Sequence, residues 1–171
     1  YNTTNSGLPH NLVTTIAFEN HVKWIGTFSL SGGMAKYNDT NWIVYNTGNS
    51  GLPSNSINSI KIDDNNNKWI CTYAGGLAKF NSFLNSWNIY DPSNSGLPSY
   101  YTYCITFRNN YTKFIGLETN GISIFNDTLW QNFNTSNSPL PNNVISDIKI
   151  DTYNNIWITT HGGLVVYSPN T

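Results

Sequence analysis

One short motif recurs along the chain and constrains its fold more than any other feature. Asn-Ser-Gly-Leu-Pro begins at Asn5, Asn49 and Asn94, and the variant Asn-Ser-Pro-Leu-Pro begins at Asn137, so successive copies lie 43–45 residues apart. A fixed period of this length is typical of a repeat protein, in which each unit buries its apolar surface against its neighbours.

Three further markers follow this motif. They are an aromatic residue followed by isoleucine, a Gly-Gly or Asn-Gly pair, and a tryptophan three residues before an aromatic residue. The first marker begins at Trp24, Trp69, Phe114 and Trp157. The second begins at Gly32, Gly75, Asn120 and Gly162, and the third at Trp42, Trp87 and Trp130. We divide the chain into four repeats, approximately 1–45, 46–90, 91–133 and 134–171, the last of which lacks the segment with the third marker.

The residues between the markers favour β-strands. Ile, Thr, Tyr, Trp and Phe are common, and Asn, Ser, Gly and Pro fill the gaps between apolar runs. The former favour strands and the latter favour turns. In the second repeat we predict strands at Ile57–Asp63, Lys68–Tyr73, Leu77–Asn81 and Ser86–Tyr90.

Four short antiparallel strands repeated at this spacing predict an all-β fold built of β-propeller blades, each a four-stranded antiparallel sheet. A single blade cannot bury both of its faces, so the Trp and Ile side chains are expected to pack between blades. The same reasoning predicts that Ile16, Ile60, Ile105 and Ile148 occupy equivalent buried positions. Four blades are at the low end for a closed propeller, of about 4–8 blades. We therefore expect part of a larger propeller or assembly, completed by further blades or by self-association, in which the last blade lacks its outer strand.

Composition excludes several classes of function. The net charge is −1 with only eight Lys and Arg, too few for a nucleic-acid-binding face. No apolar run is long enough to span a membrane. His10, His21 and His161 lie in different repeats and share no metal-ligand spacing, and the Asp63–Asn67 loop lacks the EF-hand pattern. No catalytic or cofactor motif is present, so no cofactor and no metal are expected, and Cys71 and Cys104 are expected to be unpaired.

The candidate binding residues lie in loops that differ between repeats while the framework stays constant. In a propeller, the loop after the second strand and the loop between blades share one face, where repeat proteins bind ligands. These loops contribute Phe28, Tyr73, Glu118, His161 and Tyr100. This mixture suits a carbohydrate or another small polar ligand, with solvated loops as the alternative interpretation.

Part of the second repeat resembles the two-component-regulator propeller repeat. The resemblance rests on Gly51–Ile60, Asp63, Lys68–Thr72 and Gly75–Phe80, and its spacing extends over essentially the whole chain. It implies the periplasmic or extracellular sensor of a bacterial hybrid histidine kinase, many of which respond to carbohydrates. We therefore expect a non-catalytic propeller for ligand sensing or interaction in signal transduction.

Two other functions stay open. The same repeats occur in secreted structural or adhesive proteins. Residues 155–159, Asn-Ile-Trp-Ile-Thr, are similar to the repeats of streptogramin lyases, which need a convergent His, Glu and magnesium. Glu118 and His161 occupy matching loops of adjacent repeats and are the candidates for that chemistry.

Overall fold

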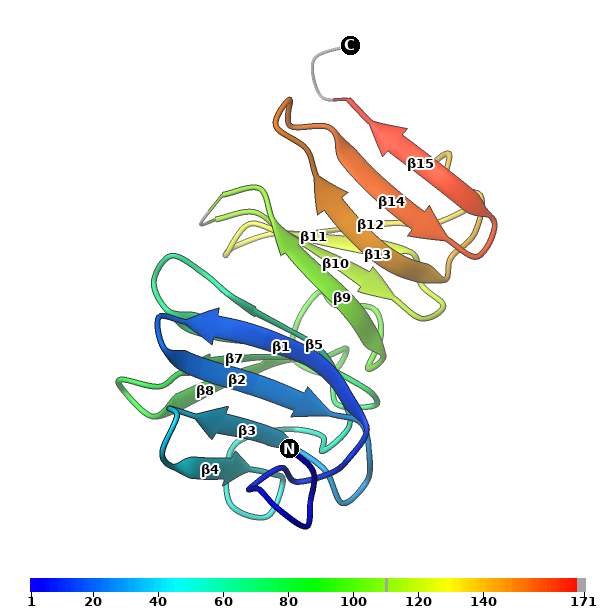
Figure 1. Cartoon of the computed structure of the whole chain (residues 1–171). Coiled ribbons are helices and arrows are strands. Elements are labelled where there is room, and N and C mark those ends of the chain that lie inside the picture. The colour runs from blue at the N-terminus through cyan, green and yellow to red at the C-terminus, as the bar shows by residue number, and fades with distance from the viewer. Residues whose placement is uncertain (110, 169–171) are drawn as a thin grey trace.

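The computed structural model describes residues 1–109 and 111–168, and these form four antiparallel sheets without a helix (Figure 1). No helix that could cross a membrane occurs in this part of the chain. We call the sheets the first to fourth blades. The first blade holds β1 (Val13–Glu19), β2 (Val22–Thr27), β3 (Met34–Tyr37) and β4 (Trp42–Tyr45), and the second holds β5 (Ile57–Ile62), β6 (Asn67–Thr72), β7 (Leu77–Asn81) and β8 (Ser86–Tyr90). The third holds β9 (Thr102–Phe107), β10 (Lys113–Leu117), β11 (Ile122–Phe125) and β12 (Trp130–Phe133), and the fourth holds β13 (Ile145–Ile150), β14 (Ile156–Thr160) and β15 (Gly163–Tyr167).

The all-β prediction is confirmed, and the strands of the second blade lie within one residue of the predicted bounds. Each blade is a meander whose strands are hydrogen-bonded in chain order. The first strands of neighbouring blades contact one another, β1 with β5, β5 with β9, and β9 with β13. The blades therefore follow one another in chain order, as Figure 1 shows. In the described residues the fourth blade has three strands.

The Asn-Ser-Gly-Leu-Pro motif forms the turn between blades. In the second copy, Asn49 Oδ1 accepts the Asn46 N–H at 2.9 Å, Asn46 Oδ1 accepts the Gly48 N–H at 2.8 Å, and Ser50 Oγ donates to the Asn46 carbonyl at 2.7 Å. These bonds close a polar turn that delivers Leu52 into the core. The motif recurs because every blade junction needs the same turn.

In the first three blades, the second glycine of the Gly-Gly or Asn-Gly pair is required by the outer strand. Gly76 has φ +75°, and a Cβ there would lie 2.3 Å from the Tyr90 carbonyl oxygen of β8. Gly163 has φ +132°, but a Cβ there would meet no atom within 4 Å. The difference arises because no fourth strand lies beside β15 among the described residues.

The core lies between blades. Trp24 and Trp69 are fully buried, and Ile60, Ile105 and Ile148 are 1–2% exposed, as predicted. The prediction was wrong for Ile16, which is 51% exposed although it has the same place in the strand register. Burial at this position requires a second blade against that face of β1, and none of the other three described blades lies against it.

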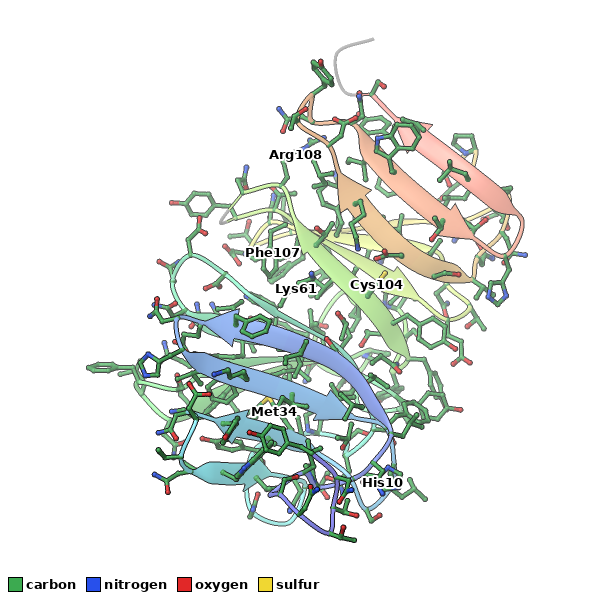
Figure 2. The ribbon with its side chains drawn as sticks, in the orientation of Figure 1. His10, Met34, Lys61, Cys104, Phe107 and Arg108 are labelled. Atoms are coloured by element: carbon green, nitrogen blue, oxygen red, sulfur yellow. The ribbon has the colours of Figure 1, made fainter. Side chains whose placement is uncertain are left out.

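Both cysteines are buried and free. Cys104 lies on β9 (Figure 2) and Cys71 on β6. Burial raises the pKa of the Cys104 thiol to about 12 and raises that of Cys71 well above its ordinary value. Both therefore stay protonated at neutral pH and behave as small apolar side chains.

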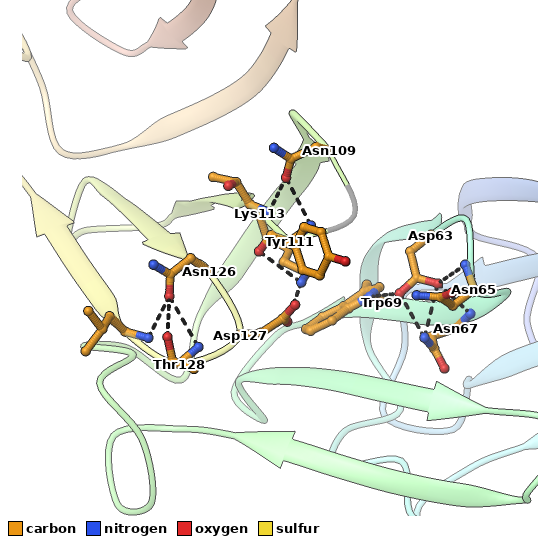
Figure 3. A network of polar contacts seen from close by, with 12 residues as sticks. Asp63, Asn65, Asn67, Trp69, Asn109, Tyr111, Lys113, Asn126, Asp127 and Thr128 are labelled. Atoms are coloured by element: carbon orange, nitrogen blue, oxygen red, sulfur yellow. Dashed lines mark hydrogen bonds and ion pairs between the residues drawn. The ribbon is translucent and has the colours of Figure 1, made fainter.

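The carboxylate of the Asp63–Asn67 loop accepts a hydrogen bond from the indole of Trp69. Figure 3 shows Asp63 accepting hydrogen bonds from Trp69 Nε1 at 2.8 Å, Asn67 Nδ2 at 2.9 Å and the backbone N–H of Asn65 at 3.0 Å. Because neighbouring donors occupy this carboxylate, it serves to orient the indole of Trp69.

Candidate functional site

In each blade, one candidate residue follows the second strand. The same backbone hydrogen bond fixes its position in all four blades. Phe28, Tyr73, Glu118 and His161 donate their backbone N–H groups at 2.9–3.2 Å to the carbonyls of Leu12, Ser56, Tyr101 and Val144, respectively. Each acceptor lies in the chain just before or at the start of its blade's first strand. The four residues are therefore equivalent and belong to successive blades, which supports their placement on one loop face.

A β-bulge repeats in the first strand of every blade beside this face. The pairing register skips Thr14, Asn58, Tyr103 and Ser146 in turn. A bulged residue leaves the ladder, so its side chain can be aimed away from the sheet. Thr14 Oγ1 donates to the Ile57 carbonyl at 2.6 Å and Asn58 Nδ2 to the Thr102 carbonyl at 2.8 Å. These two hydrogen bonds link the first blade to the second and the second blade to the third.

The bulged residue of the third blade, Tyr103, bonds within its own blade instead of to a neighbouring one, because its longer side chain reaches Glu118. The phenol donates to Glu118 Oε1 at 3.3 Å. Burial raises the pKa of Tyr103, and the Glu118 carboxylate and Tyr73 raise it further. The phenol therefore remains a protonated hydrogen-bond donor throughout the neutral pH range.

Aromatic rings on the same face contact one another across three blades. The ring of Phe28 lies 5.6 Å from that of Tyr73, which lies 4.9 Å from that of Tyr101, both in edge-to-face geometry. Tyr73 is 38% exposed. We call this row together with the Tyr103–Glu118 pair the loop-face cluster: Phe28, Tyr73, Tyr101, Tyr103 and Glu118.

The structure brings together three of the five predicted residues, Phe28, Tyr73 and Glu118. Tyr100 is exposed and contributes its carbonyl, which accepts the Gly76 N–H at 2.8 Å across the blade junction. His161 is exposed on the fourth blade, and neither residue makes a ring contact with the cluster in the described part of the chain.

Sequence reasoning identified the correct loop but selected Tyr100, whereas its neighbour Tyr101 provides the ring that contacts Tyr73. It missed Tyr103 entirely. A signal for Tyr103 exists in the repeat. Its equivalents Thr14, Asn58 and Ser146 are all polar, and each is followed by a second polar residue before the next isoleucine. Two successive polar residues interrupt the strand alternation, and this interruption marks the bulge.

The acid and base chemistry of the face is limited. Within residues 1–109 and 111–168, no three His, Cys, Asp or Glu side chains lie close enough together to hold a metal ion. Glu118 accepts a hydrogen bond from Tyr103, and among the described residues it forms no hydrogen bond or ion pair with His161. The loop-face cluster can stack against a flat apolar face and exchange hydrogen bonds through two phenols and a carboxylate.

Comparison with known proteins agrees with this architecture. Residues 139–162 match the model of the two component regulator propeller family. No curated protein matches the chain by sequence.

Solved structures extend the likeness to the whole chain. The extracellular domain assigned to hybrid two-component system BT3049 from B. thetaiotaomicron is 27% identical with a TM-score of 0.84, and the match covers 99% of this chain and 23% of that one. The corresponding domain of BT4673 from the same organism is 21% identical, with a TM-score of 0.54, over 91% of this chain and 27% of that one. Virginiamycin B lyase from Staphylococcus aureus is 16% identical, with a TM-score of 0.73, over 100% of this chain and 59% of that one. The chain is therefore a β-propeller array that resembles the sensor propellers of hybrid two-component systems and spans about a quarter of them. Likeness to the lyase shows the fold alone.

Proposed function

We propose that this chain is a non-catalytic ligand-sensing region whose loop-face cluster binds a carbohydrate. The observation that carries the proposal is the row of ring contacts from Phe28 through Tyr73 to Tyr101, which ends beside the Tyr103–Glu118 pair. The family match and the likeness to extracellular sensor domains support the same class of function.

The chemistry of the cluster selects the kind of ligand. Sugar rings present apolar C–H faces that fit against tyrosine and phenylalanine, and hydroxyl groups that suit phenols and a carboxylate. Glu118 disfavours an anionic ligand through like-charge repulsion. A neutral oligosaccharide long enough to lie across three blades fits best.

A glycan array followed by isothermal titration calorimetry tests the proposal. We expect Tyr73→Ala combined with Glu118→Ala to weaken binding of the glycan found for the wild type by more than tenfold. The matched control is His161→Ala, which changes the equivalent position on the fourth blade but lies outside the cluster. It should bind as the wild type does.

Equal binding by the double variant and the wild type would place the site elsewhere. Absence of any glycan binding would favour a structural or adhesive role. Because these side chains lie in loops outside the core, the urea midpoints of all three proteins should agree closely, which separates loss of binding from loss of folding.

A further inference from the structure

The loop face changes in polarity from the first blade to the third. The first-blade loop carries Phe28 and Leu30, the second-blade loop carries Tyr73, and the third blade presents Tyr103 and Glu118. Apolar side chains therefore lie at one end of the loop-face cluster and hydrogen-bonding groups at the other. A ligand that matches this surface has an apolar end and a polar end.

The loop between β2 and β3 is longer than its counterparts. Residues 28–33 join these two strands, whereas residues 73–76 and 118–121 join the corresponding strands of the second and third blades. The tip of the longer loop is Leu30, which is 91% exposed. Ser29 and Ser31, on either side of it, are bonded to each other, Oγ to Oγ at 3.1 Å. Their hydroxyls thus serve the turn itself, and the side chain that the loop offers to solvent is a leucine.

The segment that leads into the second blade holds this loop beside Tyr73. Asn55 Nδ2 donates to the Leu30 carbonyl at 2.8 Å. Ser54 Oγ donates to the Tyr73 carbonyl at 2.6 Å, and the Ser56 carbonyl accepts the Tyr73 N–H at 2.9 Å. Three consecutive residues therefore fix Leu30 and Tyr73 to one short segment. All of these contacts belong to the junction of the first and second blades, both of which the structure describes.

Phe28 completes the apolar end of the face. Its ring lies 5.6 Å from the Tyr73 ring in edge-to-face geometry. The bulged residue of this blade, Thr14, donates its hydroxyl to the Ile57 carbonyl, so that hydroxyl is used within the blade junction. We call Phe28 and Leu30 the apolar end of the loop face.

The third blade provides the opposite chemistry. Its bulged residue, Tyr103, donates to Glu118 Oε1 at 3.3 Å. Thr119 is exposed next to Glu118, and its hydroxyl donates to Asn120 Oδ1 at 2.9 Å. Hydroxyl and carboxylate oxygens accept more than one hydrogen bond, so these groups can also bond to sugar hydroxyls. We call Tyr103, Glu118 and Thr119 the polar end of the loop face.

We propose that the carbohydrate bound by the loop-face cluster carries an apolar group at one end, and that this group lies against Phe28 and Leu30. The inference rests on the proposed function, because it assigns a chemical class and an orientation to the same carbohydrate. A sugar hydroxyl placed against Leu30 would lose its hydrogen bonds to water without gaining others. An aryl or acyl group in that place removes apolar surface of both partners from water. The sugar hydroxyls then lie over the polar end.

Isothermal titration calorimetry with matched probes tests the inference. The probes are cellotetraose, xylotetraose and mannotetraose, each as the free sugar, as its 4-nitrophenyl glycoside and as its hexyl glycoside. The wild type should bind a substituted form about tenfold more tightly than its free sugar, a preference that burial of about 55 Å² of apolar surface provides. Preference for the nitrophenyl form indicates an aromatic group in the natural carbohydrate, and preference for the hexyl form indicates an acyl chain.

Two variants separate the two ends of the face. Leu30→Ser should reduce the preference for the substituted form to about twofold or less, because the leucine no longer covers the apolar group. Glu118→Ala should weaken the free and substituted forms by the same factor and keep the preference. The matched control is Leu84→Ser, the same change at a residue 67% exposed in the turn between β7 and β8, which should keep the wild-type preference.

The remaining outcomes distinguish failure of the inference from failure of the proposed function. Equal affinity for free and substituted forms would overturn the inference alone. A preference that Leu30→Ser retains would place the apolar group elsewhere and would also overturn it. Failure of every probe to bind in any form would overturn the inference together with the proposed function. Urea midpoints of the three variants, compared with the wild type, separate each result from misfolding.

Discussion

The second and fourth blades contain the same local device in different surroundings. In both, an aspartate four residues before an asparagine and six before a tryptophan holds the indole Nε1, at 2.8 Å for Asp63 and Trp69 and 2.9 Å for Asp151 and Trp157. In both, the asparagine side chain also donates to the aspartate. Local geometry is therefore nearly identical in the two loops.

Their burial differs completely. Trp69 is fully buried beneath the third blade, whereas Trp157 is 39% exposed. The comparison separates two contributions to one motif. Hydrogen bonds within the loop orient the tryptophan in either place, but only a following blade removes it from water.

The largest expected effect comes from deleting the two indoles. Trp69→Ala should lower the free energy of unfolding by about 3–5 kcal/mol, the usual cost of removing a large buried aromatic side chain. Trp157→Ala should cost about 1–2 kcal/mol, because much of that ring is already hydrated. Urea denaturation measures both. Equal costs would show that the loop, and not the blade interface, provides the stability.

The next largest loss of stability is expected from substituting the glycine of the inter-blade turn. A Cβ at Gly51 would lie 2.5 Å from Cγ of Trp87 on β8. Gly51→Ala should therefore destabilise by about 1–3 kcal/mol through overpacking.

The fourth repeat provides the matched control for this change, because Pro139 occupies the glycine position there. Pro139→Gly should alter the urea midpoint only slightly, through the entropy of the unfolded chain. A tolerated Gly51→Ala would contradict the close approach of Trp87.

A smaller effect is expected from neutralising the carboxylate that holds the indole. Asp63→Asn keeps the shape but weakens the hydrogen bonds from Trp69 and Asn67, and should cost about 1–2 kcal/mol. Asp151→Asn should cost less because that loop is solvated. Thermal unfolding of the two variants side by side measures the difference, and a larger loss for Asp151→Asn would reverse the comparison.

The smallest expected effect is the dependence of the unfolding free energy on pH. Burial acts to raise the pKa of Asp63, but hydrogen bonds from Asn67 and Trp69 outweigh it and leave the pKa lowered. For Glu19, burial is likewise outweighed by hydrogen bonds from Lys68 and Trp24. A lowered folded-state pKa stabilises the protein fully above the unfolded value of about 4, and this contribution is lost as pH falls through the folded value.

The urea midpoint should therefore be lower at pH 3 than at pH 6. The decrease should be smaller in Asp63→Asn, which has lost one of the carboxylates whose pKa is lowered. A midpoint that rises on acidification would contradict both pKa directions.

Much of the candidate site could be predicted from the repeat. Phe28, Tyr73 and Glu118 were identified because they vary within a constant framework, and the backbone bonds that place them are repeated in each blade. Tyr103 could not be predicted by strand alternation, because the bulge shifts the register at that residue. Which rings meet across blades depends on how far each side chain reaches, and a repeat alignment does not contain that information.

The sequence by itself determined the repeat, the strands and their turns, the tryptophan-holding loops and the identity of the apolar layers. These depend on residues within one period of each other, whose hydrogen bonds and side-chain alternation are local. Only the tertiary structure decided which copies of an equivalent residue are buried. Ile16 and Ile60 share their place in the repeat, yet one is half exposed and the other is covered, because burial belongs to the contact between two blades and not to either blade alone.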